Sequence, residues 1–391
     1  MKKILFLGRF TPPMHGTARM NGLYYNVLQK EYKTKKVKIN YSLSVGDIGR
    51  LSLMKFFGIF IVFFQVLYQL IIFRPNLIYF EIAPKGLAFF RDSIYVLLCK
   101  LFRGKIVFSN HARGARDEME NSLKKEYYRF IFRKTKIILL SKSLYSEFSE
   151  IYKKSDVYFL PNGIDDELSD NETSIIFKKR DNNKKLKLLF LSNMIESKGP
   201  IDALELCFMM KNAGVDFECD FVGAWGNNDF KEEWILKLKD LGLEKNCKYL
   251  GPKYDTEKKN ILEKANFLIF PTRYPMECYP LVILEAFMFG IPVLSYDTAA
   301  VKEIINKDFL GFVSKKRNVG ELYDYLIKNM GKKEHGAIRE YFKRNFTIEI
   351  AGEGKFSITR GSLYYDNDAS DKFKFDNTSS VLSLDVADAL I

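Results

Sequence analysis

The sequence predicts an α/β protein made of two doubly wound, parallel-sheet domains in tandem. Its 391 residues are about twice the usual length of one domain. Apolar residues make up 47% and charged residues 28%, ordinary globular values that exclude disordered, collagen-like and small disulfide-scaffold proteins. Short apolar runs alternate with longer stretches of helical spacing, which is typical of parallel strands joined by right-handed crossover helices.

The first half contains strand-like runs separated by helical stretches. The runs are residues 2–8, 37–43, 76–82, 105–110, 136–141 and 157–163. Residues 117–132 and 143–152 have helical spacing. Charge and prolines interrupt the first run before a signal-peptide core is complete, so we interpret it as a buried strand.

One apolar segment, residues 56–73, bears on membrane association. Its 18 residues carry no charge, and this is the length at which a membrane span becomes a candidate. It contains Gln65 and Gln69, and it continues through Arg74 and Pro75 into the next strand. We therefore favour a crossover helix on the sheet, with an outer face able to contact lipid, over a transmembrane span.

The second half repeats the alternation after a polar stretch that we interpret as an inter-domain connection. Its strand-like runs are residues 185–193, 217–223, 247–252, 266–272, 292–297 and 311–315. We expect an N-terminal domain at residues 1–165 and a C-terminal domain at residues 166–335. A helix at about residues 336–348 is expected to pack back on the first domain.

Residues 349–391 form an atypical acidic tail without helical spacing, which we expect to be disordered or a loose hairpin. The tail contains Asp366 and Asp368, two residues apart, a spacing that can hold a cation. Because no apolar strand leads into this pair, we predict no metal site.

The net charge of +13 is concentrated in the first half. Residues 1–160 carry 28 basic and 11 acidic residues, whereas residues 161–348 carry 29 of each. A basic half usually faces nucleic acid, an anionic membrane surface or a phosphorylated substrate, although a solvated lysine-rich surface is the plain alternative. The chain has no interleaved basic and aromatic recognition motif, which disfavours nucleic acid. Five cysteines without a C-x-x-C pair indicate a reducing compartment and neither a zinc site nor a disulfide frame.

Candidate functional residues follow the predicted strands, where ligands of parallel sheets bind. Gly16, after two prolines, lets backbone amides approach an anion where a helix begins. His111 follows the fourth run, where it is a functional candidate or a structural histidine. Lys198 opens the first helix of the second domain, a natural clamp for a diphosphate.

The strongest signal is the segment 266–297. A strand ends at Pro271, Glu277 lies in the following loop, and a helix from about Pro280 carries Glu285. Glu277 by itself fits an ordinary acid at a helix start. Glu285 lies more than one turn into an otherwise apolar helix, where a carboxylate needs a partner, and a ribose diol offers two hydroxyl donors.

These motifs together resemble the family 4 retaining glycosyltransferases. Glu277 and Glu285 are separated by seven residues, ahead of Gly290 and Pro292. The same family pattern is seen in Pro12-Pro13-x-x-Gly16, in His111, in the segment 160–165 and in Ser197-Lys198-Gly199. The resemblance covers roughly residues 2–348. It implies the GT-B fold, in which two Rossmann-like domains face each other across a cleft.

The resemblance implies a transfer of sugar, with retention, from a UDP- or GDP-sugar to an acceptor. The second domain would bind the donor and the first the acceptor, expected to be a lipid-linked saccharide in bacterial O-antigen or capsule assembly. No metal and no cofactor besides the donor are expected. The protein is expected to be cytoplasmic, held at the inner face of the cytoplasmic membrane by the basic first domain.

The resemblance also assigns roles to residues. Lys198 would hold the diphosphate, Glu285 the ribose, and Glu277 the transferred sugar. His111 would contact the sugar near the reacting carbon, so His111, Glu277 and Lys198 are the expected catalytic residues. Further residues expected to line the donor are Gly16, Asn193, Gly223, Leu250, Cys278, Tyr279, Pro280 and Leu281.

The chain departs from the family at Ser192-Asn193, where members usually have Gly-Arg. The second cationic phosphate ligand is therefore missing, and we hypothesise that Arg273 replaces it. Two other functions stay open. One is a sugar epimerase or hydrolase on the same fold, although a glycosidase needs two carboxylates facing one bond. The other is a non-enzymatic basic module that binds anions.

Overall fold

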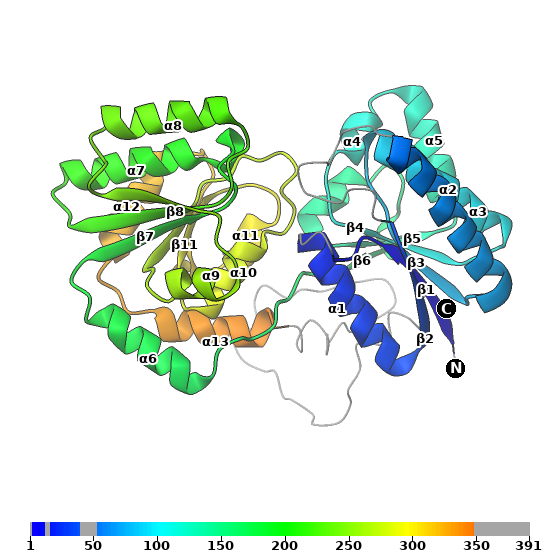
Figure 1. Cartoon of the computed structure of the whole chain (residues 1–391), viewed down its shortest axis with the longest axis horizontal. Helices are drawn as coiled ribbons and strands as arrows, with labels where there is room; N and C mark the ends of the chain where they lie inside the picture. Colours follow the sequence, from blue (N-terminus) through cyan, green and yellow to red (C-terminus); the bar gives the residue numbers. More distant parts are fainter. Residues whose placement is uncertain (1, 12–15, 40–52, 348–391) are drawn as a thin grey trace. The chain divides into compact units, whose positions relative to one another are not determined.

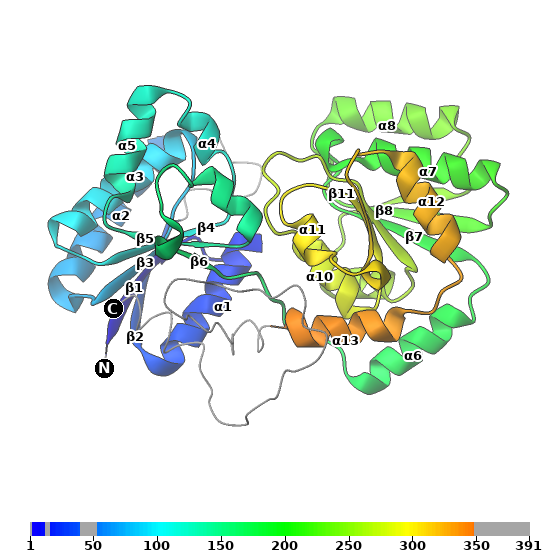
Figure 2. The same cartoon turned by 180° about the vertical axis from the view of Figure 1, so that it is seen from behind.

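The alternating apolar runs form parallel strands in two separate sheets (Figures 1 and 2). The computed structural model describes residues 2–11, 16–39 and 53–347. These residues divide into two units, and unit 1 ends at Asn162 while unit 2 spans Gly163–Thr347. Each unit has a six-stranded parallel sheet with helices on both faces, so the α/β class predicted from the sequence is confirmed.

Unit 1 has the strand order β2-β1-β3-β4-β5-β6. Its strands are β1 Lys3–Gly8, β2 Lys33–Lys38, β3 Leu77–Glu81, β4 Ile106–Asn110, β5 Lys136–Leu139 and β6 Val157–Phe159. Its helices are α1 Gly16–Glu31, α2 Leu53–Tyr68 with the π-helical turn η2 Gln69–Phe73, α3 Gly86–Leu101, α4 Ala115–Glu118, α5 Ser122–Phe132, and the 3-10 turns η3 Lys142–Glu147 and η4 Lys154–Asp156.

The two faces of the unit 1 sheet have different aromatic cores. On one face, Tyr25 of α1 meets Phe6 edge-on at a ring distance of 6.0 Å. On the other face, Phe132 of α5 meets Phe108 of β4 at 5.0 Å and Phe89 of α3 at 5.9 Å. The α2 helix packs beside α3. These contacts place α1 on one face and the α3–α5 layer on the other.

Several unit 1 elements differ from the sequence predictions. β2 pairs with β1 through Lys33 to Lys38, earlier than the expected run at 37–43. An edge strand tolerates lysines, and these lysines removed the apolar pattern by which we recognised the other strands. Residues 117–132 are split into α4 and α5, because the side chain of Asn121 caps α5 by accepting from Lys124 N. Residues 143–152 form η3 and turns rather than an α-helix.

The apolar segment 56–73 is the crossover helix that we favoured, formed by α2 and η2. It ends where Arg74 adopts a left-handed conformation with φ 51°. Among the described residues, no helix combines the length and the apolar character needed to span a membrane.

Unit 2 has the strand order β12-β11-β10-β7-β8-β9. Its strands are β7 Leu186–Leu191, β8 Phe217–Val222, β9 Cys247–Gly251, β10 Phe267–Phe270, β11 Val293–Tyr296 and β12 Gly311–Ser314. Its helices are α6 Asp170–Asp181, α7 Pro200–Asn212, α8 Asn228–Asp240, α9 Asp255–Leu262, α10 Leu281–Met288, α11 Val301–Ile304, α12 Val319–Asn329 and α13 His335–Asn345, with the 3-10 turns η5 Glu196–Lys198 and η6 Asp308–Leu310.

The segment read as an inter-domain connection contains the helix α6. Ser169 and Glu172 form a reciprocal capping box at its start, an S-x-x-E signal that is visible in the sequence. At its end, the buried Arg180 donates to the carbonyl oxygens of Phe289 (3.0 Å) and Leu262 (3.2 Å). The segment is polar because α6 lies on the outside of unit 2, where Arg180 holds its end against the rest of the unit.

The helix α13 belongs to unit 2, and its packing against the first domain stays a prediction. It lies against α10, and Arg339 forms an ion pair with Asp166 at 2.6 Å. The backbone N–H of Ile164 donates to Phe346 O at 2.9 Å. The chain therefore enters unit 2 beside the residues that follow α13, and this pairing fixes the helix there.

Candidate donor site in unit 2

The strand order of unit 2 reverses between β7 and β10, so the loops after these strands leave in opposite directions. Ligands of open α/β sheets bind at such a switch point. The two loops are joined by a hydrogen bond from Arg273 N to Ser197 O at 2.7 Å. They also approach at Gly199 (φ 80°), where an added Cβ would lie 2.3 Å from Pro271 O. Only glycine permits this approach.

Lys198 and Glu277 meet at this switch point. The Nζ of Lys198 lies 2.5 Å from Oε2 of Glu277, and the side chains are only 14% and 11% exposed. The Lys198 ammonium also lies over the ring of Tyr274, 4.4 Å from its centroid. The two residues that the sequence proposed separately are thus one mostly buried ion pair, which can exchange partners when an anion binds.

Arg273 has a partner of its own in unit 2. Its guanidinium lies 2.8 Å from the carboxylate of Asp202 in the first turn of α7. Burial raises the pKa of Asp202, and the charge of Arg273 opposes that rise. Asp202 and Tyr274 were missed by the sequence reading, because neither belongs to a motif. The role of Arg273 as a phosphate ligand stays a prediction.

Glu285 also lies in a mostly buried ion pair. Its carboxylate is 12% exposed and lies 2.8 Å from Nζ of Lys258, which comes from α9. A carboxylate on an apolar helix needs a partner, and α9 supplies Lys258 as one. A ribose would have to share Glu285 with Lys258, so the ribose role stays a prediction.

The carboxyl ends of β7, β8 and β9 bring together Asn193, Gly223 and Leu250. Gly223 follows β8 with φ 154°, and an added Cβ would lie 1.8 Å from Ser192 O. Its N–H donates to Gly251 O at 3.2 Å, directly after Leu250. Asn193 is exposed beside these turns and Leu250 is half-buried. The lack of a side chain at Gly223 therefore lets the turns after the three strands pack closely together.

The segment from Cys278 to Leu281 connects the Glu277 loop to α10. Cys278, Tyr279 and Pro280 are buried, and Cys278 O accepts from Ala300 N at 3.1 Å. Leu281 is the first residue of α10, whose first turn carries no acidic residue. The segment is therefore held in place, and the helix begins with an electrostatic environment that favours an anion.

The remaining predicted residues, His111 and Gly16, lie in unit 1. Nε2 of His111 lies 2.9 Å from Oγ of Ser109 at the end of β4. Burial, and secondarily the charge of Arg9, lower the pKa of His111 to about 3, so the imidazole is neutral near pH 7. Gly16 is exposed and begins α1, and Tyr24 of the same helix has its ring 6.5 Å from that of His111.

A buried carboxylate in unit 1 was missed by the sequence reading. Glu81 ends β3, and it lies 2.7 Å from the guanidinium of Arg9 and accepts from the side chain of Asn21. Burial raises its pKa, and Arg9 opposes that rise. The group sits where the strand order turns between β1 and β3. The run NLIYFEI was read only as an apolar strand, although its acid at the strand end was the available signal.

Metal ligation finds no support among residues 2–11, 16–39 and 53–347, where no group of three histidine, cysteine or acidic side chains could hold an ion. The described cysteines are free and buried. The Asp366–Asp368 pair, the two prolines before Gly16 and the predicted tail lie outside the described residues.

The family of unit 2 follows from its sequence. Residues 171–346 match the model of the family described as glycosyl transferases group 1. Unit 2 is a group 1 glycosyltransferase domain. The amylovoran biosynthesis glycosyltransferase AmsK of Erwinia amylovora is 26% identical over 147 residues, which are 37% of this chain and 35% of AmsK. The putative colanic acid biosynthesis glycosyltransferase WcaL of Escherichia coli (strain K12) is 27% identical over 136 residues, 33% of this chain and 32% of WcaL. The matches span about a third of these relatives.

Solved glycosyltransferases share the fold of this protein over most of the chain. A glycosyltransferase from Rickettsia africae ESF-5 has a TM-score of 0.70 at 16% identity and covers 90% of this chain and 96% of its own. Anabaena Alr3699/HepE in complex with UDP has a TM-score of 0.66 at 16% identity, with 90% and 97% covered. Together with the two parallel sheets, these likenesses confirm the predicted GT-B fold.

Proposed function

We propose that the protein is a retaining glycosyltransferase that moves a sugar from a UDP- or GDP-sugar to a lipid-linked saccharide in bacterial surface polysaccharide assembly. The observation that carries this proposal is the Lys198–Glu277 pair at the switch point of a group 1 glycosyltransferase domain. Support comes from AmsK and WcaL, whose names place them in amylovoran and colanic acid biosynthesis, and from HepE, whose complexes contain UDP and UDP-glucose.

Donor binding would exchange the partner of Lys198. A diphosphate carries more negative charge than one carboxylate, so the ammonium would leave Glu277 for the phosphate oxygens. A charge-assisted hydrogen bond contributes about 1.5–3 kcal/mol, whereas the dipole of α10 contributes about 0.3–1 kcal/mol. Lys198 is thus the dominant ligand, and Glu277 becomes available to accept hydroxyl groups of the transferred sugar, beside Cys278 and Tyr279.

The rate enhancement would come from charge that is in place before the reaction. Negative charge develops on the leaving diphosphate while the sugar passes through an oxocarbenium-like state, and Lys198 meets that charge. His111 would contact the sugar as a neutral imidazole, able to donate or accept a hydrogen bond but not to supply a cation. We propose that the reaction needs no metal, because Lys198 and the start of α10 supply positive charge at the leaving group.

The rest of the donor would lie along the neighbouring strand ends. Glu285 would accept the ribose hydroxyls beside Lys258, and Gly223, Leu250 and Asn193 would line the nucleotide. Arg273 would add a second cation for the phosphates on leaving Asp202. In unit 1, Gly16 would leave room for the phosphates. We propose that the protein works in the cytoplasm, at the inner face of the membrane that holds the lipid acceptor.

A thermal-shift screen of the full chain against nucleotide sugars, with and without phosphate-linked lipid acceptors, tests the proposal. We expect one UDP- or GDP-sugar to raise the melting temperature and to be turned over in EDTA. NMR of the product should show the anomeric configuration of the donor. An inverted product contradicts retention, loss of turnover in EDTA contradicts metal independence, and no donor binding contradicts the function.

A further inference from the structure

One layer of unit 1 presents an extensive apolar surface to solvent. We call it the apolar face. It comprises exposed side chains of α2, η2, α3 and α5, with Phe102 directly after α3: Phe57, Phe60, Ile61, Phe64, Tyr68, Ile71, Ile72, Leu87, Phe90, Ile94, Leu97, Leu101, Phe102, Leu123 and Phe130. Leu101 is 77% exposed and Leu123 is 82% exposed. Contiguous exposure of this kind marks an interaction site, whereas scattered apolar residues do not.

The apolar face has helical order. On α3 the exposed residues recur at 87, 90, 94, 97 and 101, in steps of three and four, so they form one outer stripe. The inner side of α3, including Phe89 and Val96, is fully buried. α3 is thus apolar on both sides, which an aqueous surface alone does not explain.

The neighbouring helix repeats the pattern. On α2 and η2 the buried side chains are Val62, Val66, Leu70 and Phe73, a narrow stripe, and most of the other apolar side chains from Phe57 onward are partly or fully exposed. The hydroxyl of Tyr95 on α3 donates to Ile59 O at 3.2 Å, which holds the two helices side by side. The two outer stripes therefore form one surface.

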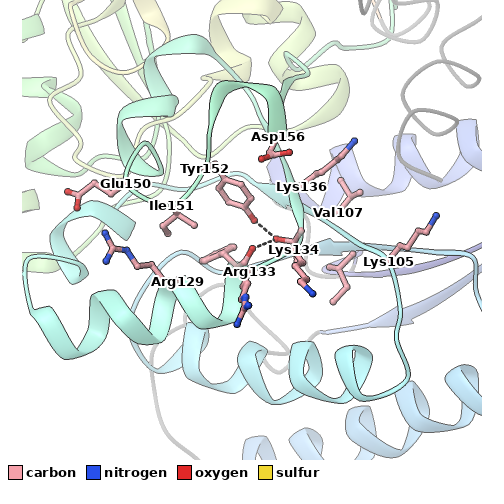
Figure 3. A pocket seen from close by; sticks show the side chains of 13 residues that line it. Lys105, Val107, Arg129, Arg133, Lys134, Lys136, Glu150, Ile151, Tyr152 and Asp156 are labelled. Atoms are coloured by element: carbon pink, nitrogen blue, oxygen red, sulfur yellow. Dashed lines mark hydrogen bonds between the residues drawn. The ribbon is translucent and has the colours of Figure 1, made fainter. Parts of the chain in front are cut away.

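A basic hollow adjoins this surface. The hollow has a volume of about 710 Å³, and its lining includes Lys105, Arg129, Arg133, Lys134 and Lys136 together with Glu150 and Asp156. Figure 3 shows the basic side chains around Ile151 and Tyr152. Outside the lining, Lys125 forms an ion pair with the acid Glu150, and Glu126 forms one with the base Arg129. The hollow therefore carries a net positive charge suited to a phosphate group.

The hollow and the apolar face are joined through Lys100. Its Nζ donates to Phe130 O at 2.9 Å and to Arg133 O at 3.1 Å, so the ends of α3 and α5 are held together. At this junction, the exposed Leu101 and Phe130 lie next in sequence to Lys100 and Arg129. Apolar side chains are thus placed beside cationic ones, as in helices that lie in a membrane interface.

We propose that the apolar face docks on a bilayer and that the basic hollow binds the phosphate of an anionic lipid headgroup. Charge argues for lipid over protein: α2 has no acidic residue, and the acid of α3, Asp92, is buried beside Arg91 at 2.6 Å. The exposed acid of α5, Glu126, is paired with Arg129 at 2.6 Å. The inference deepens the proposed function, since a transferase with a lipid acceptor must meet the membrane. Its test does not require activity.

Vesicle sedimentation of the full chain tests the apolar face. The variant replaces Leu87, Ile94, Leu97 and Leu101 by serine, all exposed, so the fold should keep its melting temperature. With phosphatidylcholine vesicles containing phosphatidylglycerol, we expect its partition coefficient to fall at least about tenfold. The matched control replaces Ile175, Leu236 and Met330, exposed apolar residues of unit 2, by serine and should bind like wild type.

A second variant tests the hollow. Arg133→Gln with Lys134→Gln should weaken binding to the anionic vesicles about thirtyfold, because each cation near an anionic surface contributes roughly a factor of five. The control Lys315→Gln with Lys316→Gln removes two exposed charges from unit 2 and should have no effect. On pure phosphatidylcholine, wild type and the hollow variant should bind equally weakly.

Three outcomes overturn the inference. They are sedimentation of the serine variant like wild type, equal wild-type binding to neutral and anionic vesicles, and a wild-type dimer in gel filtration that the serine variant loses. The last outcome assigns the face to a second copy of the chain. Calorimetry of nucleotide-sugar binding separates the two proposals, because a failed membrane test with intact donor binding removes the docking face alone.

Discussion

Units 1 and 2 each place helices around a six-stranded parallel sheet, but they differ in what they leave exposed. Nineteen large apolar side chains are exposed among the described residues, and fifteen of them belong to the apolar face of unit 1. Unit 2 exposes four, scattered over its surface, and its special feature is a set of ion pairs whose carboxylates, Glu277, Glu285 and Asp202, are at most 12% exposed. The same fold thus carries an extended apolar surface in unit 1 and a compact polar site in unit 2.

The two units differ in net charge and in where their basic residues lie. Unit 2 has no net charge over residues 161–348, so it has no general attraction for anions. Its positive charge matters locally, at Lys198 and Arg273. Unit 1 has an excess of bases, and part of that excess borders an apolar surface. A charge placed at a buried site recognises one group, whereas charge spread over an exposed rim recognises a surface. We therefore expect a single substitution in unit 2 to remove much of the proposed donor binding or turnover. In unit 1 we expect the loss of membrane binding to grow with the number of residues replaced.

The largest effect should come from Lys198→Ala. We expect the transfer rate to fall about 10²–10³-fold, because the positive charge opposite the leaving group is lost. Steady-state turnover measures this. Lys187→Ala is the control, since Lys187 pairs with Glu218 near the start of β7 and β8. Near wild-type turnover by Lys198→Ala would contradict the site.

Gly223→Ala should destabilise unit 2 by about 2–4 kcal/mol. The new Cβ would collide with Ser192 O at 1.8 Å, and the backbone conformation at φ 154° is one that alanine avoids. Denaturant unfolding measures this. Gly336→Ala is the matched control: nothing lies within 4 Å of its added Cβ, and its place in α13 predicts a gain of about 0.5–1 kcal/mol. Equal effects would show that the Gly223 turn is not constrained.

If Glu285 accepts the ribose hydroxyls as proposed, Glu285→Gln should weaken donor binding about 10–100-fold, because a mostly buried carboxylate is replaced by a neutral amide. Lys258→Met removes the partner of Glu285 but leaves the carboxylate for the ribose. Calorimetry with the nucleoside diphosphate should therefore separate the two variants. If Lys258→Met loses as much affinity as Glu285→Gln, the ion pair itself, and not ribose binding, is the role of Glu285.

The smallest effect concerns pH. The pKa of His111 is lowered to about 3 in the folded protein, below the unfolded value near 6.5, so its folded form binds fewer protons. Its contribution to stability is full above about pH 6.5 and is lost as the pH falls toward 3. His111→Gln should flatten the loss of stability between pH 6.5 and 5 by at most about 1.4 kcal/mol per pH unit. An NMR titration of His111 with a midpoint near 6.5 would contradict this.

The fold was readable from the sequence because parallel strands are buried on both faces and appear as apolar runs. Each of the expected runs in unit 2 contains a strand. The reading failed where that signal was absent, at the lysine-rich edge strand β2 and at the polar helix α6. The sequence also does not show contacts such as Arg339–Asp166, which join α13 to the start of unit 2 across many positions of the chain.

The candidate donor site was readable only in part. Lys198, Glu277 and Glu285 could be named, because their positions after strands or inside an apolar helix need explanation. Their partners could not be named: the sequence does not indicate that Lys198 meets Glu277 across 79 positions, or that Lys258 reaches Glu285. Such pairings depend on the strand order, which puts β7 beside β10, and this order follows from tertiary packing.

Hydrogen exchange of the full chain tests the division between the two units most directly. With a nucleotide sugar, we expect slower exchange in residues 192–199 and 271–285 and no change in α2 and α3. With anionic vesicles, we expect the reverse, with slower exchange in residues 57–73 and 87–102. Protection of both sets by the same ligand, or protection of α2 and α3 by the nucleotide sugar alone, would contradict the account.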